Sequence, residues 1–356
     1  MPQNPDHNNN YQDSAAAASR AQFLASNRAG KVFFGNLEVD RQNVQTLVAI
    51  TLLAIAGLII ILPALISPFF EPLPKMDAES KTEIVRVASG EEMINLLKEN
   101  DLWELNDNGA VPPLLLASYP EDLDEFTIGV KKKLFFHGLL PVALTALEEV
   151  REEKEMLRTI LAKFPEGYRH PVFSDDFAVW GKILSSDEID FILALTRKYR
   201  TRRAAELVRR VDLLPLSMIL AQAAIESSWG TSRFARKGNN LFGVWTWGEK
   251  GIIPELREEG KKHKVAAYDT ILESVRAYIL NLNRLAAYRE LRLLRRFTMN
   301  PLKLADGLLF YSQRRDSYVW EIKNLIKFNN LIQYDQCFLA GRPGEDEKMK
   351  LVYKLI

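Results

Sequence analysis

Glu226 is the side chain in this sequence best suited to acid catalysis. It lies near the end of the segment PLSMILAQAAIESSWG, in which residues 217–227 are good helix formers that follow Pro215. Apolar residues on almost every side of this helix predict that it is buried. A carboxyl group at the end of a buried helix is partly desolvated, so its pKa rises toward a value useful to a general acid. The ordinary alternative is a solvated glutamate at a helix end.

The loop that follows Glu226 is rich in aromatic and amide side chains. Aromatic rings offer flat apolar faces, and asparagine amides offer both donors and acceptors, so this loop is suited to hold a ligand. This composition predicts ligand contacts from Trp229, Asn239, Asn240, Phe242 and Trp245. Core packing is the alternative for Trp229 and Phe242. Trp245 and Trp247 have the same parity on a strand and should share one face, which suits a cleft wall or a packed core.

The elements around this loop are mostly helical. Residues 244–247 and 264–268 have strand character and are separated by glycine turns, which predicts one or two small β-hairpins. The expected fold class is therefore α+β, mostly helical. Helical spacing and capping patterns predict helices over residues 91–98, 121–135, 141–164, 185–199, 202–210, 272–285, 288–295, 301–310 and 317–328.

Composition excludes several classes of protein. The chain of 356 residues has 47 Lys and Arg against 46 Asp and Glu, and this balance argues against a nucleic-acid partner. Paired arginines such as those at 202–203, 209–210 and 295–296 are expected to be solvated helix faces. The single cysteine, Cys337, cannot form an intramolecular disulfide, and the four histidines show no ligand spacing. We therefore expect no metal and no cofactor.

The N-terminal part of the chain predicts a membrane anchor. Residues 1–43 are polar and predict a disordered cytoplasmic tail. Residues 46–70 carry no charge and are long enough to span a bilayer, so we expect a transmembrane signal anchor over residues 44–70. A cleaved signal peptide is the alternative, but the polar leader is long and no small-x-small site follows. Residues 71–84, which contain Pro72 and Pro74, predict a linker.

The orientation of this anchor rests mainly on the sizes of its two flanks. Basic and acidic residues occur on both sides of the span, so the positive-inside rule gives only a weak preference. A short tail and a large C-terminal body favour a cytoplasmic tail. The expected location is the inner (cytoplasmic) membrane, spanned once, with the body on the periplasmic or wall side.

Four segments resemble successive motifs of family 73 glycoside hydrolases, bacterial β-N-acetylglucosaminidases that cut peptidoglycan. They read AQAAIESSWGTSRFA, NNLFGVW, AAYDTILESVRAYI and LLFYSQRRDSYVWEI. Upstream, VPPLLLASYPEDLDEF and KKKLFFHGLLPVALTALEEV resemble the N-terminal part of the Bax-like branch of that family. The resemblance covers about residues 85–335, and the pair ESxWG and NNLFG is its most specific part.

This resemblance implies a lysozyme-like fold in which Glu226 protonates the leaving oxygen. The transition state of such a reaction is oxocarbenium-like, and a second carboxylate usually acts as base, nucleophile or stabiliser. In the family that carboxylate lies in the hairpin region, but IIPELREEGKKHKV departs from the common Thr-Glu form. By spacing, Glu258 is the best candidate and Glu255 the next. Glu249 and Glu259 are further candidates, and assistance by the substrate's own acetamido group is the alternative.

The family pattern also implies roles for two tyrosines. Tyr311 matches the first tyrosine of the motif YSQRRDSY, where a hydroxyl near the acid can position water or stabilise developing charge. Tyr318 is the second tyrosine of the motif and is expected to contact substrate. A core aromatic at a helix end is the alternative for Tyr311.

Together these features predict a membrane-anchored peptidoglycan hydrolase that cleaves the β-1,4 bond after N-acetylglucosamine. The alternatives are a lytic transglycosylase on the same fold, which the NNLFG motif disfavours, and a non-catalytic wall-binding protein. Beyond the tail, anchor and linker, the expected organisation is a helical N-terminal region of Bax-like proteins over residues 85–200, a catalytic domain over residues 201–340 and a C-terminal tail over residues 341–356.

Overall fold

The computed structural model describes residues 31–34, 37–40, 84–105, 108–164, 173, 181–255 and 263–340. The chain divides into two units, residues 1–76 and residues 77–356. In the first unit, β1 (Lys31–Phe34) and β2 (Leu37–Asp40) pair in an antiparallel hairpin. The prediction of a disordered tail over residues 1–43 did not anticipate this hairpin. The predicted anchor, residues 44–70, lies outside the described residues. Among the residues that the structure describes, none of the helices combines the length and the hydrophobicity of a membrane span.

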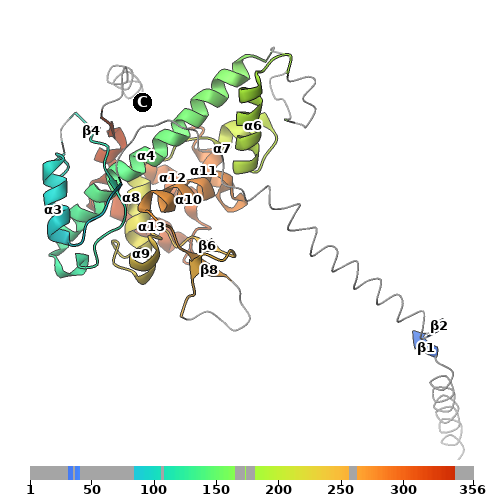
Figure 1. Cartoon of the computed structure of the whole chain (residues 1–356), viewed down its shortest axis with the longest axis horizontal. Helices are drawn as coiled ribbons and strands as arrows, with labels where there is room; N and C mark the ends of the chain where they lie inside the picture. Colours follow the sequence, from blue (N-terminus) through green and yellow to red (C-terminus); the bar gives the residue numbers. More distant parts are fainter. Residues whose placement is uncertain are drawn as a thin grey trace, which may run out of the picture. The chain divides into compact units, whose positions relative to one another are not determined.

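The second unit is built mainly from helices (Figure 1). Short 3₁₀ turns link several of them: η2 (Leu123–Glu125), η4 (Ala286–Tyr288), η5 (Ala305–Leu308) and η6 (Leu331–Gln336). The helices are α3 (Gly90–Glu99), α4 (Ile128–Ala162), α6 (Ser186–Lys198), α7 (Ala204–Arg210), α8 (Leu216–Glu226), α9 (Arg233–Gly238), α10 (Ile271–Arg284), α11 (Arg289–Leu294), α12 (Pro301–Leu304) and α13 (Asp316–Phe328).

The strands of this unit are short. β3 (Ile84–Val85) pairs with β5 (Leu115–Leu116), and β4 (Ala110–Val111) pairs with β9 (Phe338–Leu339), both in parallel. β6 (Trp245–Thr246), β8 (Lys264–Ala266) and β7 (Gly251–Ile252) form an antiparallel sheet in the order β6-β8-β7. The mostly helical composition with small sheets confirms the coarse fold prediction and is consistent with a lysozyme-like fold.

α4 is one helix of 35 residues, where the sequence predicted two helices separated before Pro141. Pro141 lies inside the helix, and the Thr145 hydroxyl donates to the Pro141 carbonyl at 2.8 Å. An internal proline costs about 3 kcal/mol. The buried stretch from Leu134 to Leu147 packs on both sides of Pro141 and offsets that cost, because each large apolar side chain contributes about 1.5–3 kcal/mol on burial.

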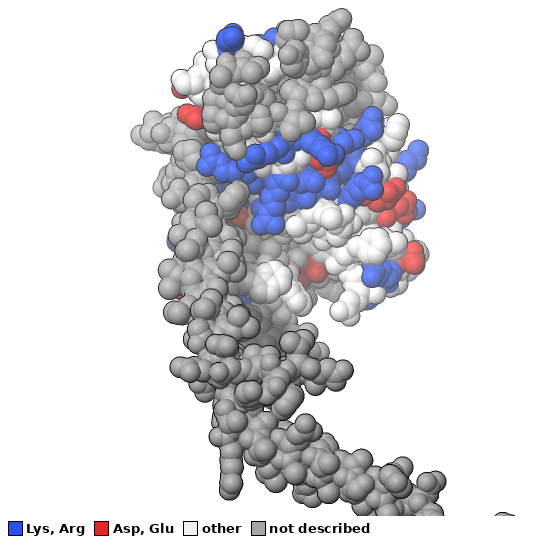
Figure 2. Space-filling model, turned by 90° about the vertical axis from the view of Figure 1, so that its right-hand side faces the viewer, with Lys and Arg blue, Asp and Glu red and all other residues white. Residues whose placement is uncertain are grey.

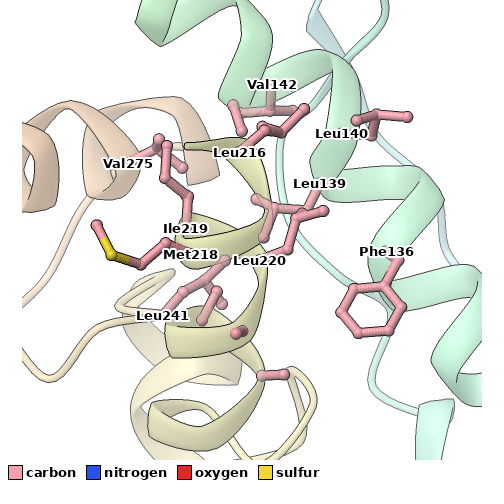
Figure 3. Close-up of a cluster of buried hydrophobic side chains, with 14 of the residues drawn as sticks. Phe136, Leu139, Leu140, Val142, Leu216, Met218, Ile219, Leu220, Leu241 and Val275 are labelled. Atoms are coloured by element: carbon pink, nitrogen blue, oxygen red, sulfur yellow. The ribbon is translucent and has the colours of Figure 1, made fainter. Parts of the chain in front are cut away.

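The main core surrounds α8. Its residues Leu216 to Ala224 are all buried, which confirms the burial expected from its apolar faces. α8 packs against α4, α13 and η6. Figure 3 shows side chains of α4 meeting those of α8, with Leu139 beside Leu220, while Val275 of α10 approaches from the other side. A helix held on several sides in this way gives its last residue a fixed position.

The predicted boundary at residue 200 does not separate two compact units. α4 belongs to the predicted N-terminal region, yet it packs on α8 and α10 of the predicted catalytic domain. A smaller cluster joins the end of α4 to α6 and α7 through Leu157, Ile160, Ile192 and Leu207. α4 therefore supplies one wall of the core that holds α8.

One of the paired arginines, Arg295, is buried, contrary to the expectation of solvated helix faces. Figure 2 shows Lys and Arg side chains gathered in a band across one face of the second unit. Arg202, Arg203 and Arg296 are exposed, but Arg295 is only 5% exposed. The guanidinium of Arg295 donates to the Asn283 side chain at 2.8 Å and to the backbone carbonyls of residues 209, 212 and 213. Arg295 thus ties the end of α7 to α10 and α11.

Candidate active site

The start of α8 is fixed by a residue distant in sequence. Pro215 is the N-cap residue and has no side-chain hydrogen bond to offer. Asp335 of η6 supplies the capping hydrogen bond instead. Its carboxylate accepts hydrogen bonds from the Ser217 backbone N–H at 2.7 Å and from the Ser217 hydroxyl at 2.8 Å. An anionic acceptor at a helix N-terminus is favourable, while burial raises the pKa of Asp335 to about 6.

The end of α8 turns sharply. Glu226 is the last helical residue and Ser227 the C-cap. The buried Ser227 hydroxyl donates to the Ala223 carbonyl and accepts the Gly230 N–H at 2.8 Å. Residues 228, 229 and 230 then have φ values of 51°, 63° and 80°, in the left-handed region. Two of these three residues are not glycine, and backbone strain of this kind is commonly found at functional sites.

Glu226 lies half-buried beside a row of hydrogen-bonded polar groups. The Tyr318 hydroxyl of α13 donates to the Glu226 carboxylate and accepts from the Gln222 amide at 2.9 Å. The Gln222 carbonyl in turn accepts from the Tyr278 hydroxyl of α10. Gln222 lies one turn before Glu226 on α8, so one helix face carries both polar groups. This network is buried and fixes the orientation of the carboxyl group.

The pKa of the Glu226 carboxyl is raised above its ordinary value. Burial is the largest cause, since it disfavours the charged form. The hydrogen bond from Tyr318 and the positive charge of Arg314 act in the opposite direction, while the negative charge of Glu321 adds to the rise. The net effect keeps a larger fraction of Glu226 protonated near neutral pH, as a general acid requires.

The Tyr318→Phe substitution should raise the pKa of Glu226 further, because it removes a hydrogen bond that stabilises the carboxylate. The alkaline limb of the pH profile of kcat/KM should therefore move to higher pH. Stability should fall by about 1 kcal/mol, because the Gln222 amide loses its acceptor. Tyr334→Phe is the control, since its hydroxyl bonds His137 instead. An unshifted limb in Tyr318→Phe would contradict this role.

The NNLFG turn lies next to Glu226 and is held by Asn240, which is 1% exposed. Its amide nitrogen donates to the Val244 and Ala266 carbonyls at 2.9 and 2.8 Å, and its oxygen accepts the Phe242 and Val244 N–H groups. No capacity is left for a sugar, so the predicted substrate contact is wrong for Asn240. The turn brings Gly243 to the acid, where a Cβ would lie 3.8 Å from Glu226 Oε2.

Asn239 also stabilises the NNLFG turn. It ends α9 with φ of 50°, a conformation that asparagine adopts more readily than most residues. Its amide nitrogen donates to the Tyr268 and Asp269 carbonyls, both at 3.2 Å. The structure thus gives Asn239 a contact with the segment after β8, and its predicted contact with substrate stays a prediction.

Three of the predicted aromatic contacts are core or network residues. Phe242 is 2% exposed and stacks on Tyr278 at 4.0 Å between ring centroids, so the prediction of substrate contact is wrong for Phe242. Tyr318 is 0% exposed and reaches Glu226 through its hydroxyl, so it positions the acid and its predicted contact with substrate is wrong. Trp229 packs edge-on against Phe136 at 5.2 Å, with the Lys132 ammonium 4.9 Å from its ring centroid.

Tyr311 holds the NNLFG turn from the other side. Its hydroxyl donates to the Phe242 carbonyl at 2.9 Å, and its ring stacks parallel to Tyr318 at 5.5 Å. The charge of Glu226 raises the pKa of Tyr311, although burial is the larger cause. This hydroxyl is therefore committed to positioning the turn, and a direct catalytic role for Tyr311 stays a prediction.

Trp245 and Trp247 are exposed aromatic residues in the segment that directly follows the turn. Trp245 is 54% exposed and stacks on His263 at 4.2 Å, while Trp247 is 75% exposed. Both follow Gly243 closely in sequence, so this exposed pair begins near the acid. The placement of Trp245 is consistent with its predicted contact with a sugar ring.

The hairpin carboxylates fall partly within the described structure. Glu258 and Glu259 lie outside the described residues. The side chain of Glu255 is 77% exposed and pairs with Arg233 of α9 at 3.0 Å. The carboxylate that acts electrostatically on Glu226 in the described part is Glu321 of α13, which sequence reasoning missed.

Sequence reasoning also missed Gln222, Tyr278, Tyr288 and Arg314. Tyr278 and Tyr288 lie close enough to Glu226 for its charge to raise their pKa values, although burial dominates for both. Gln222 carried a local signal, because it precedes the acid by one helical turn. The others come from α10, η4 and the loop before α13, and their proximity depends on the packing of those elements.

Part of the chain matches a known family of enzymes. Residues 201–331 match the family model described as mannosyl-glycoprotein endo-beta-N-acetylglucosaminidase. The chain therefore contains a glucosaminidase domain of glycoside hydrolase family 73, as the resemblance implied.

Individual relatives match smaller parts of the chain. The protein bax of Escherichia coli is 43% identical over 86 residues, which are 24% of this chain and 30% of that protein. Peptidoglycan hydrolase FlgJ of Salmonella typhimurium is 34% identical over 118 residues, or 30% of this chain and 35% of that protein. The catalytic domain of the autolysin Auto from Listeria monocytogenes is 22% identical over 46% of this chain and 99% of that domain, with a TM-score of 0.27. The matched part of this chain spans about a third of the length of bax and of FlgJ.

Proposed function

We propose that this protein is a peptidoglycan hydrolase that cleaves the β-1,4 bond after N-acetylglucosamine, with Glu226 as general acid. The observation that carries the proposal is the half-buried Glu226 carboxyl, which is bonded to Tyr318 and faces the Gly243 turn. The glucosaminidase domain over residues 201–331 and the relatives named peptidoglycan hydrolase support the substrate class.

The chemistry follows from the state of Glu226. A sugar alkoxide is a poor leaving group, so the protonated carboxyl donates its proton to the glycosidic oxygen as the bond to C1 breaks. The resulting oxocarbenium-like centre is attacked by water, by a carboxylate or by the acetamido group of the substrate. Glu258 stays our prediction for the second carboxylate, and Glu255 is the next candidate.

We also propose that residues 44–70 anchor the enzyme in the cytoplasmic membrane, with residues 84–340 on the wall side. The uncharged stretch at residues 46–70 supports the anchor, and the location of peptidoglycan supports the orientation. A fusion of a reporter active only outside the cytoplasm to residue 340 tests both points. Reporter activity that remains in the soluble fraction, or none at all, would contradict them.

The products of digestion separate the proposed activity from its closest rival. Mass spectrometry of digested peptidoglycan should show reducing N-acetylglucosamine ends. Anhydromuramic ends would identify a lytic transglycosylase instead. Binding to purified sacculi without any released fragment would favour the wall-binding alternative.

Trp245→Ala should weaken binding of glycan strands by about tenfold, since loss of an aromatic platform of this kind is worth about 1.4 kcal/mol. Its melting temperature should stay close to that of the parent, because more than half of the side chain is exposed. The control is Phe328→Ala, whose side chain is 87% exposed at the far end of α13, about 15 Å along the helix from Tyr318. Equal binding by parent and Trp245→Ala would exclude this contact.

A further inference from the structure

An ion pair near Glu226 joins Arg314, in the loop before α13, to Glu321 of α13. Arg314 Nη1 and Glu321 Oε2 are 2.6 Å apart, with the side chains 52% and 40% exposed. The Arg314 guanidinium lies 5.4 Å from the centre of the Tyr318 ring, and the Tyr318 hydroxyl bonds Glu226. An accessible cation is thus separated from the proposed proton donor by a single aromatic side chain.

In this arrangement the Arg314 guanidinium can exchange the Glu321 carboxylate for a carboxylate of a ligand. An exposed ion pair contributes little to stability, so Arg314 can leave Glu321 at small cost. A guanidinium can bind a carboxylate through two parallel N–H donors, which makes arginine the usual residue for recognition of such groups. The next residue, Arg315, points elsewhere, because its guanidinium lies 4.5 Å from the centre of the Phe310 ring.

We propose that Arg314 is a substrate-binding residue that receives a carboxylate of the peptide stem carried by the muramyl sugar, in exchange for Glu321. The inference rests on the proposed function, because it assumes that Glu226 acts on a glycan with such stems. The muramyl residue adjoins the scissile bond, so its acidic stem emerges close to Glu226. Glu321 keeps the site electrically neutral while it is empty, and Arg314 selects strands with free carboxylates over neutral glycans.

The test measures binding by calorimetry to the full-length chain carrying Glu226→Gln, which prevents turnover. One probe is a tetrasaccharide of alternating N-acetylglucosamine and N-acetylmuramic acid with its peptide stems. The second probe is the same fragment with every carboxyl group converted to a methylamide. The Glu226→Gln protein with Arg314 intact should bind the anionic probe about tenfold more tightly than the neutral probe.

Two variants and a matched control then assign this preference. Arg314→Gln should abolish it, whereas Arg315→Gln removes the same charge from the neighbouring residue and should preserve it. Glu321→Gln should strengthen binding of the anionic probe alone, by about threefold, because the competing carboxylate is gone.

The outcomes separate this inference from the proposed function. A preference that survives in Arg314→Gln, or equal binding of both probes by the parent, overturns the role of Arg314 and leaves the hydrolase proposal intact. Failure of the parent to bind either probe contradicts both, since the glycan would not be a ligand. Loss of the preference in Arg315→Gln as well would reduce the effect to overall charge and also overturn the inference.

Discussion

Glu226→Gln should reduce the rate of peptidoglycan hydrolysis by roughly 100- to 10,000-fold, the usual contribution of a positioned general acid. Glutamine keeps the size of the side chain and can still accept the Tyr318 hydroxyl, but it cannot deliver a proton. Release of reducing ends from purified sacculi measures the effect. Glu149→Gln is the control, because that carboxylate pairs with Arg276 on the surface.

The same substitution should not destabilise the protein at neutral pH. Burial raises the pKa of Glu226 in the folded state, so the fold favours the protonated form. The protonated carboxyl group makes its full contribution to the free energy of unfolding at pH values below its pKa in the unfolded state. That contribution is lost as the pH rises through the pKa of Glu226 in the folded state. Glutamine is uncharged at every pH, so the melting temperature of the variant relative to the parent should increase with pH. A variant that clears sacculi at the parental rate, or that unfolds at neutral pH, would contradict our assignment.

Asn240→Ala should produce the largest loss of stability among the residues of the site. It leaves the Ala266 carbonyl and the Phe242 and Val244 N–H groups without their Asn240 partner, while the Val244 carbonyl keeps the Ala266 N–H. Because each unsatisfied buried group costs about 1–3 kcal/mol and some relaxation is expected, we predict a loss of about 3 kcal/mol. The melting temperature should fall by roughly 6–12 °C. Activity should fall with it, since the turn positions Gly243 beside Glu226.

This outcome distinguishes a structural from a substrate-binding role for Asn240. A residue that only touched substrate would raise KM and leave the melting temperature unchanged. Asn239→Gly is the matched control, because glycine tolerates the φ of 50° and only two hydrogen bonds of 3.2 Å are lost. Its melting temperature should fall much less than that of Asn240→Ala.

The buried helix that ends at Glu226 was predictable because its signals are local. The apolar residues of α8 lie on all its sides, and the polar residues that follow form a recognisable motif next to Glu226. The strands around residues 244–268 were predictable for the same reason, from side-chain types and glycine turns. Alternation and spacing report what a short segment does by itself.

The roles of individual site residues were less predictable, because they depend on contacts between distant segments. Asn240 has the chemistry of a sugar ligand, but the approach of β8 places the Ala266 carbonyl within its reach. Arg314 and Glu321 resemble ordinary surface charges until α13 packs against α8. The continuity of α4 through Pro141 was missed because packing outweighed a local helix breaker.

The contact between Asp335 and Ser217 has a consequence for how the catalytic unit should be delimited. The match to the family ends at residue 331, before Asp335. A fragment cut at that boundary would keep the acid at one end of α8 and lose the acceptor that holds the other end. It would also lose β9, which closes against β4. We therefore expect the smallest fragment that folds by itself to be longer than the region that matches the family, and fragments for crystallisation or engineering should extend from residue 84 to residue 340.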